Sequence, residues 1–100
     1  MKTIGIDIGT TTISGVILER TDTGKLKVLE TKTIENDSFL AAANDWEKIQ
    51  DAEKLVTKSQ ELLDDFLDRY PDVERIGLTG QMHGIVYIDK EGNGVSPLYT

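Results

Sequence analysis

The chain has 100 residues, enough for one small domain or part of a larger one, and 38% of them are hydrophobic, an ordinary fraction for a globular protein. No apolar run reaches the roughly 20 residues of a membrane-spanning helix, and no cysteine is present for a disulfide or a thiolate metal site. The net charge of −7 argues against a nucleic-acid partner, because such binding depends on lysine and arginine. The first residues do not form a signal-peptide pattern, so we expect a cytoplasmic protein with no membrane partner.

The first third of the chain predicts three strands joined by turns. Alternating isoleucine and polar residues indicate a strand over residues 3–8. Residues 13–18 are apolar on both faces, which is typical of a strand inside a sheet, and β-branched residues predict a third strand over 26–34. Short turns at 9–12 and 21–24 join these strands, so we expect a three-stranded antiparallel meander.

A helix is predicted between Asp51, a favourable N-cap residue, and Pro71, which cannot continue a helix. Its side chains follow the three- and four-residue spacing of one buried helix face. The residues at this spacing are Ala52, Leu55, Val56, Ser59, Leu62, Leu63, Phe66, Leu67 and Tyr70.

Further strands are predicted after the helix, over residues 75–79, 85–88 and 95–100, the last at an edge because it contains Pro97. Residues 36–45 show no period and are expected to form a loop. The order of strands and helix indicates an α/β fold with a mixed sheet. No second helix is predicted to cover the other face of that sheet, so we expect an incomplete domain.

The first chemical signal is Asp7-Ile8-Gly9-Thr10-Thr11-Thr12, at the end of the first predicted strand. An aspartate among isoleucines is costly unless its carboxylate meets water, a cation or a hydrogen-bond donor. Gly9 permits a tight turn, and the backbone N–H groups and three hydroxyls that follow could surround a phosphate. A carboxylate beside such a cradle suits a magnesium–nucleotide site; the alternative is an ordinary hairpin turn.

The second signal is Thr79-Gly80-Gln81-Met82-His83-Gly84, which follows a predicted strand and contains the only histidine of the chain. The flanking glycines leave the backbone free to turn and allow a ligand to approach. Glutamine and histidine supply donors and acceptors of the kind that bind sugar hydroxyls. The alternative is a structural histidine, whereas a metal site is disfavoured because there is no second histidine and no cysteine.

Residues 5–12 resemble the first phosphate motif of the actin-like ATPase superfamily, which includes sugar kinases, heat-shock chaperones and actin. Gly80-Gln81-Met82-His83-Gly84 resembles the sugar-binding loop of the FGGY carbohydrate kinases, most closely those acting on xylulose and sedoheptulose. Trp46-Glu47 with Gln50-Asp51 is similar, at looser spacing, to a segment that these kinases carry before the helix. Residues 86–100 resemble the hairpin that leads into the tryptophan–aspartate sugar motif of the family.

The resemblance implies that residues 1–100 are the N-terminal part of the first of two ribonuclease H-like domains, with the second domain absent from this chain. It implies ATP and Mg²⁺ as cofactors, a ketose of the xylulose or sedoheptulose class as substrate, the remainder of the polypeptide as partner, and a parent enzyme compatible with a homodimer. The implied roles are magnesium and phosphate binding for Asp7, through water to the metal; phosphate binding for Gly9, Thr10, Thr11 and Thr12; and sugar binding for Gln81, Met82 and His83.

The catalytic base of that family is an aspartate far downstream, which matches no residue here, so residues 1–100 alone are expected to be inactive. Two other interpretations stay open. One is a different ATPase of the actin-like superfamily, such as the activator of a radical dehydratase. The other is a small acidic interaction domain without catalysis, against which the unfinished sheet argues.

Overall fold

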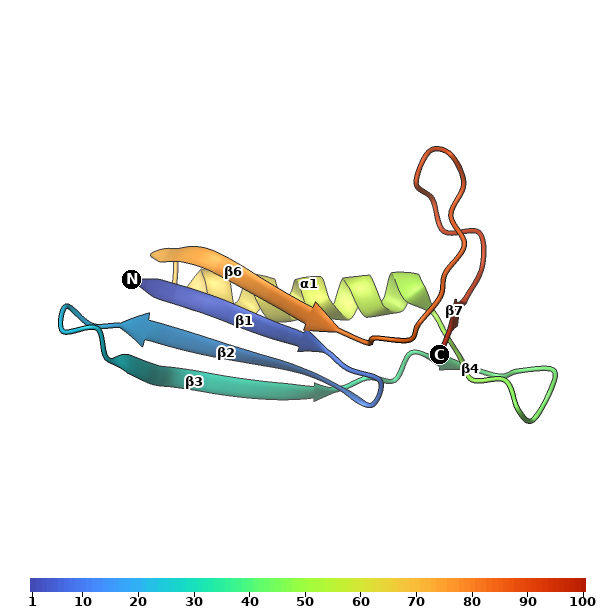
Figure 1. Ribbon diagram of the computed structural model, residues 1–100, viewed down its shortest axis with the longest axis horizontal. Helices are drawn as coiled ribbons and strands as arrows, with labels where there is room; N and C mark the ends of the chain where they lie inside the picture. Colours follow the sequence, from blue (N-terminus) through green and yellow to red (C-terminus); the bar gives the residue numbers. More distant parts are fainter.

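The computed structural model describes all 100 residues, which form a four-stranded mixed sheet with one helix across one face (Figure 1). β1 (Lys2–Ile8), β2 (Thr12–Arg20) and β3 (Leu26–Glu35) form the predicted antiparallel meander. β6 (Val73–Gly80) pairs with the other edge of β1 in parallel, so the strand order is β3-β2-β1-β6. The prediction of an α/β fold with a mixed sheet is confirmed.

The helix α1 (Ala52–Arg69) begins and ends where the sequence predicts. The side chain of Asp51 accepts a hydrogen bond from the backbone N–H of Lys54 at 3.2 Å, which satisfies one of the free donors of the first turn. At the other end, the N–H of Tyr70 donates to the carbonyl of Phe66 at 2.7 Å. The helix therefore stops just before Pro71.

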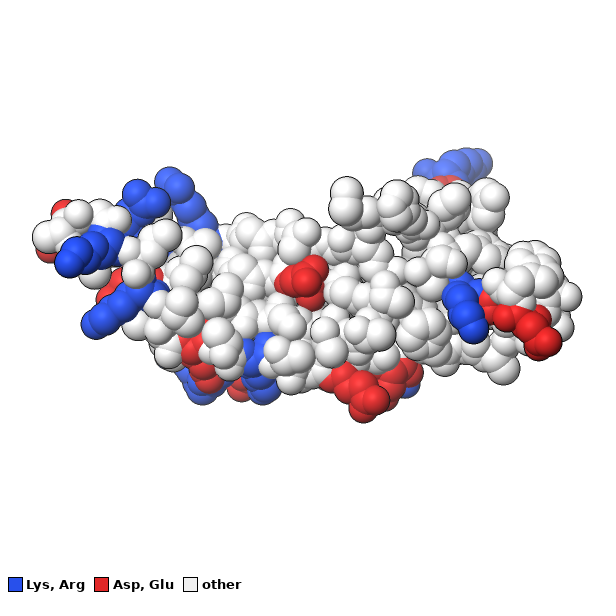
Figure 2. Space-filling view, turned by 60° about the horizontal axis from the view of Figure 1, so that its bottom comes forward, with Lys and Arg blue, Asp and Glu red and all other residues white.

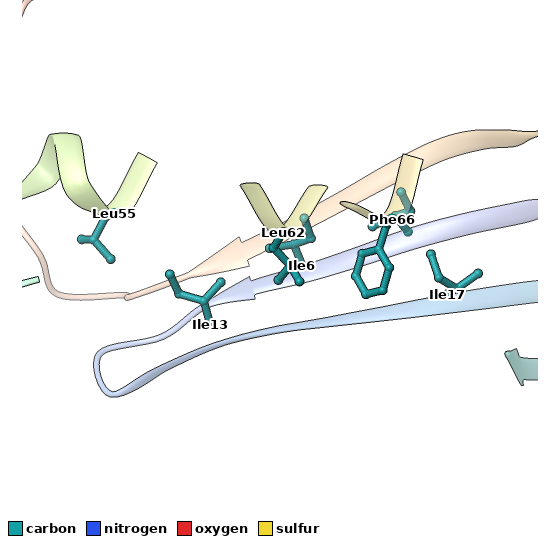
Figure 3. Close-up of a cluster of buried hydrophobic side chains, with 7 residues drawn as sticks. Ile6, Ile13, Ile17, Leu55, Leu62 and Phe66 are labelled. Carbon is teal, nitrogen blue, oxygen red and sulfur yellow. The ribbon is translucent and has the colours of Figure 1, made fainter. Parts of the chain in front are cut away.

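The core lies between α1 and the two central strands (Figure 3). Leu55, Leu62 and Phe66 point from the helix toward the isoleucines of β1 and β2, and all are buried. The isoleucines that meet them are Ile4, Ile6, Ile13 and Ile17. Burial of this apolar surface fixes α1 over β1 and β2, at about 25 cal/mol for each Å² removed from water.

The opposite face of the sheet has no helix over it. Here Asp7 of β1 and its register partner Ser14 of β2 lie on the same side, with Val16 and Thr33 nearby. Figure 2 shows this face as mostly uncharged across its middle, with an acidic side chain within it and charges gathered toward the rims. The side chains of β2 on this face are only partly buried, so the strand is not enclosed on both sides.

A second, small sheet lies beyond the ends of β1 and β6. It contains β4 (Phe39–Leu40), β5 (Ile49–Gln50) and β7 (Leu98–Tyr99) in the order β4-β5-β7, all antiparallel. The predicted loop over residues 36–45 therefore includes a short strand. Because β7 pairs with β5, the end of the chain lies beside the segment that precedes α1.

The prediction of a regular strand over residues 85–88 is wrong, and the predicted strand over 95–100 is reduced to β7. Single bridges join Ile85 to Tyr99 and Ile88 to Gly94. Between them, the N–H of Tyr87 donates to the side-chain oxygen of Ser96, and Pro97 has no N–H to donate, so a continuous ladder cannot form. No helix in the structure combines the length and apolarity needed to span a membrane.

Candidate functional site

The two segments singled out in the sequence leave the sheet at the same edge. Because β1 and β6 are parallel, Asp7 pairs with Thr79 and Ile8 pairs with Gly80, and both strands end there. The turn over residues 9–12 and the loop over residues 80–84 therefore begin side by side (Figure 1). In α/β folds, ligands bind beyond the carboxyl ends of parallel strands, which is where these segments lie.

The carbonyl groups of the turn face inward and are bound by buried amides. Asn36 Nδ2 donates to the carbonyls of Gly9 at 2.8 Å and Thr10 at 3.0 Å, and the backbone N–H of Asn36 donates to Thr11 at 2.9 Å. Gln50 Nε2 donates to the Thr10 carbonyl as well, at 3.0 Å. The turn is therefore anchored from inside by side chains that lie far from it in the sequence.

The N–H groups of Thr10 and Thr11 have no hydrogen-bond partner within the chain. All three threonines of the turn are exposed, so these N–H groups and hydroxyls are available to a ligand. Gly9 is required by the turn, since a Cβ atom there would lie 2.7 Å from the carbonyl oxygen of Thr12. Successive free N–H groups with carbonyls turned away form a concavity suited to an anion such as a phosphate.

Asp7 is exposed on the open face of the sheet, two residues before the turn. It lines a shallow hollow of about 590 Å³ and is the one charged residue of that lining, which also includes Ser14, Thr33 and Thr79. No group of three or more histidine, cysteine or acidic side chains gathers in the chain, so no all-protein metal cage exists. One carboxylate beside a phosphate cradle fits Mg²⁺, which commonly takes one or two carboxylates together with phosphate oxygens and water.

The three candidate sugar-binding residues in the loop after β6 do not share one environment. Gln81 turns inward: its Nε2 donates to Gln50 Oε1 at 2.8 Å, and its Oε1 is buried with no partner. Met82 and His83 are exposed and free to meet a ligand. A Cβ atom at Gly84 would come within 2.9 Å of Leu98, so a glycine lets the loop pack against β7.

Asn36 and Gln50 are the site residues that the sequence did not single out for this role. Both are almost completely buried, at 4% and 0% exposure, although neither belongs to the apolar core. Asn36 Oδ1 accepts hydrogen bonds from the N–H and hydroxyl of Ser38, which orients its amide nitrogen toward the turn. The one available signal was Gln50 beside the helix cap, within the segment that resembles the FGGY kinases.

Comparison with known proteins shows the fold. No protein-family model matches the sequence, and no curated protein matches it. Among solved structures, the chain is similar to xylulose kinases from Brucella ovis (TM-score 0.81) and Rhodospirillum rubrum (TM-score 0.79), each at 19% identity over 99% of this chain. It is also similar to a gluconate kinase from Lactobacillus acidophilus, with a TM-score of 0.72 and 18% identity over the whole chain.

The chain spans about a fifth of the length of these structures, since it covers 20% of each of them. The likeness extends through the meander, α1, β6 and the small sheet, because nearly every residue of the chain is aligned. The chain therefore has a ribonuclease H-like α/β fold, which it shares over nearly its whole length with these structures.

Proposed function

We propose that the chain belongs to an FGGY carbohydrate kinase, as the N-terminal part of its first domain. The whole protein would transfer the γ-phosphoryl group of ATP to a hydroxyl of a ketose of the xylulose or sedoheptulose class. The choice of a sugar kinase is supported by the similar structures, which are those of xylulose and gluconate kinases. The motif over residues 80–84 supports the ketose class, through its resemblance to the sugar loop of those kinases.

The observation that carries the proposal is the turn after β1. Its carbonyls are held inward by Asn36 and Gln50, and the N–H groups of Thr10 and Thr11, which follow Asp7 closely in the chain, are left free. An ordinary hairpin turn has no need of two buried amides that orient it in this way. Phosphoryl transfer depends mainly on positioning and on electrostatic stabilisation, and a preorganised set of donors supplies both.

In this proposal, Thr10 and Thr11 bind phosphate oxygens through their N–H groups, with the hydroxyls of the three threonines as further donors. Asp7 would hold Mg²⁺ through water. When bound, the metal supplies positive charge that offsets the charge of the phosphates. The base that accepts the proton of the attacking hydroxyl comes from the rest of the polypeptide.

The sugar lies against the loop after β6, within reach of the same edge of the sheet. Met82 and His83 contact it directly, because both are exposed. Gln81 serves the sugar site by holding the loop, since its amide nitrogen is already bound to Gln50. Phosphate and sugar would then meet where β1 and β6 end, so the two reacting groups would be held close together.

The full-length protein tests the proposal in an assay of ADP release with ATP, Mg²⁺ and a panel of xylulose, sedoheptulose and gluconate. We expect release that depends on one of the ketoses. Release that depends on gluconate alone would move the acceptor to the sugar acids, and release without dependence on any sugar would favour another ATPase of the superfamily. Residues 1–100 alone are the matched control and are expected to transfer no phosphate.

A further inference from the structure

We propose that Gln50 is a positioning residue that holds the loop over residues 80–84 against the turn over residues 9–12. It lies in β5 of the small sheet and is fully buried. Its side chain joins the two segments directly: Nε2 donates to the Thr10 carbonyl at 3.0 Å and Oε1 accepts from Gln81 Nε2 at 2.8 Å. The proposed function uses Gln50 as one of two anchors of the turn, and its further role is to control the position of the loop.

The Thr10 carbonyl determines the direction of both hydrogen bonds of the Gln50 side chain. A backbone carbonyl can only accept, so the Gln50 amide must present its nitrogen to Thr10. Its oxygen then faces Gln81, which must in turn present its own nitrogen. The Gln81 oxygen is left buried without a partner, so the hydrogen bond to Gln50 is the single polar contact that its side chain makes.

The loop over residues 80–84 depends on Gln50 more than the turn over residues 9–12 does. The turn keeps its anchors if Gln50 is lost, because Asn36 also binds the carbonyls of Gly9 and Thr10. The Gln81 side chain has no second partner, so loss of the Gln50 amide leaves a buried amide without any hydrogen bond. A buried polar group in that state is costly, and the loop would shift to hydrate it. Gln50 therefore matters chiefly to the loop, and Asn36 to the turn.

Because the loop depends mainly on Gln50 and the turn mainly on Asn36, variants at these two residues should change different Michaelis constants. The kinetic readout rests on the proposed function. In the full-length protein, Gln50→Met should raise the ketose KM by roughly tenfold or more and leave the ATP KM within about twofold of the wild type. Asn36→Leu should raise the ATP KM by roughly tenfold or more and leave the ketose KM within about twofold of the wild type.

A second readout does not depend on the identity of the substrate. Hydrogen exchange of the Ile85 amide, which donates to the Tyr99 carbonyl directly after the loop, should become faster in Gln50→Met, whereas exchange of the Gly9 amide, which donates to the Thr12 carbonyl within the turn, should stay near the wild-type rate. If the full-length protein phosphorylates no sugar, the kinase proposal fails and this measurement still decides the role of Gln50. If Gln50→Met does not fold, Gln81→Met removes the same hydrogen bond from the other side and should give the same pattern.

The result that would overturn the inference is an unchanged ketose KM in an active Gln50→Met enzyme, together with unchanged exchange of the Ile85 amide. A parallel rise of both KM values in Gln50→Met and Asn36→Leu, with a matching fall in melting temperature, would reduce both residues to general supports of the fold. The positioning role of Gln50 requires that Gln50→Met raises mainly the ketose KM and that Asn36→Leu raises mainly the ATP KM.

Discussion

At the scale of single residues, Asp7 carries the charge of the candidate site. It is the one charged residue that lines the hollow in the open face, and it precedes the free N–H groups of Thr10 and Thr11 by a few residues. In the proposed kinase, a carboxylate in this place would act on a bound metal and on charge that develops during transfer.

Replacing Asp7 with asparagine keeps the shape of the side chain and removes its charge. In the full-length protein we expect Asp7→Asn to lower kcat by ~10²-fold or more, with little change in the ketose KM. Steady-state kinetics of phosphate transfer measure both constants. Asp22→Asn is the matched control, because it removes the same charge from the exposed turn at the other end of β2. A variant that retained a tenth of the wild-type kcat would make Asp7 a structural residue.

His83 is the second residue whose role can be isolated. It is exposed, so its removal should not disturb the core. If it binds a substrate hydroxyl, His83→Ala should raise the ketose KM by several-fold to about a hundredfold, the cost of one lost hydrogen bond and its unpaired partner. The ATP KM and the melting temperature should stay near the wild-type values. A parallel loss in all three quantities would instead indicate a structural histidine.

At the scale of elements, the contact between α1 and β2 depends on a glycine in the middle of the strand. Gly15 is buried beneath the helix, and a Cβ atom there would overlap the ring of Phe66 and lie 3.3 Å from a methyl group of Leu62. Gly15→Ala should therefore lower the free energy of unfolding by about 1–3 kcal/mol, the usual cost of overpacking. Urea unfolding measures this. Gly94→Ala is the control, because a Cβ atom there meets nothing and its φ is not positive, and equal losses would contradict the explanation.

At the scale of the whole molecule, ion pairs join α1 to the outer part of the sheet. Arg69 contacts Glu30 at 2.6 Å and Asp65 at 2.8 Å, and Lys32 contacts Asp65 at 3.2 Å. The hydrogen bond from Arg69, followed by that from Lys32, lowers the pKa of the Asp65 carboxyl group below its ordinary value. All of these groups are at the surface, where such pairs contribute little individually and are weakened by salt.

A pH dependence of stability follows from the direction of this shift. A carboxyl group with a lower pKa in the folded chain binds a proton more weakly when folded, so its contribution is present above the unfolded pKa and is lost as the pH falls through the folded pKa. Unfolding measured from neutral pH to below the ordinary value of 3.8 should show this loss. Asp65→Asn should be less stable at neutral pH and lose less on acidification. Asp68→Asn, on the same helix without an ion pair, should keep the wild-type pH profile.

The sequence by itself determined the meander, the helix and the chemistry-bearing residues. Strand alternation, the turn residues and the spacing of apolar residues after Asp51 are local patterns, and local patterns specify local structure. The motif over residues 7–12 was also visible, because an aspartate followed by a glycine turn is unusual in a run of isoleucines. A strand over residues 85–88 was expected on the same kind of pattern and did not form, since Ser96 and Pro97 on the facing segment interrupt the ladder.

Only the tertiary structure decided how these parts meet. The parallel pairing of β6 with β1 brings residues 9–12 beside residues 80–84, and no local pattern specifies a partner some seventy residues away. The burial of Asn36 and Gln50 was equally hidden, because a polar residue in a loop or a short strand is ordinarily solvated. Their amides are buried because the inward carbonyls of the turn need donors, and that need exists only once the chain has folded around it.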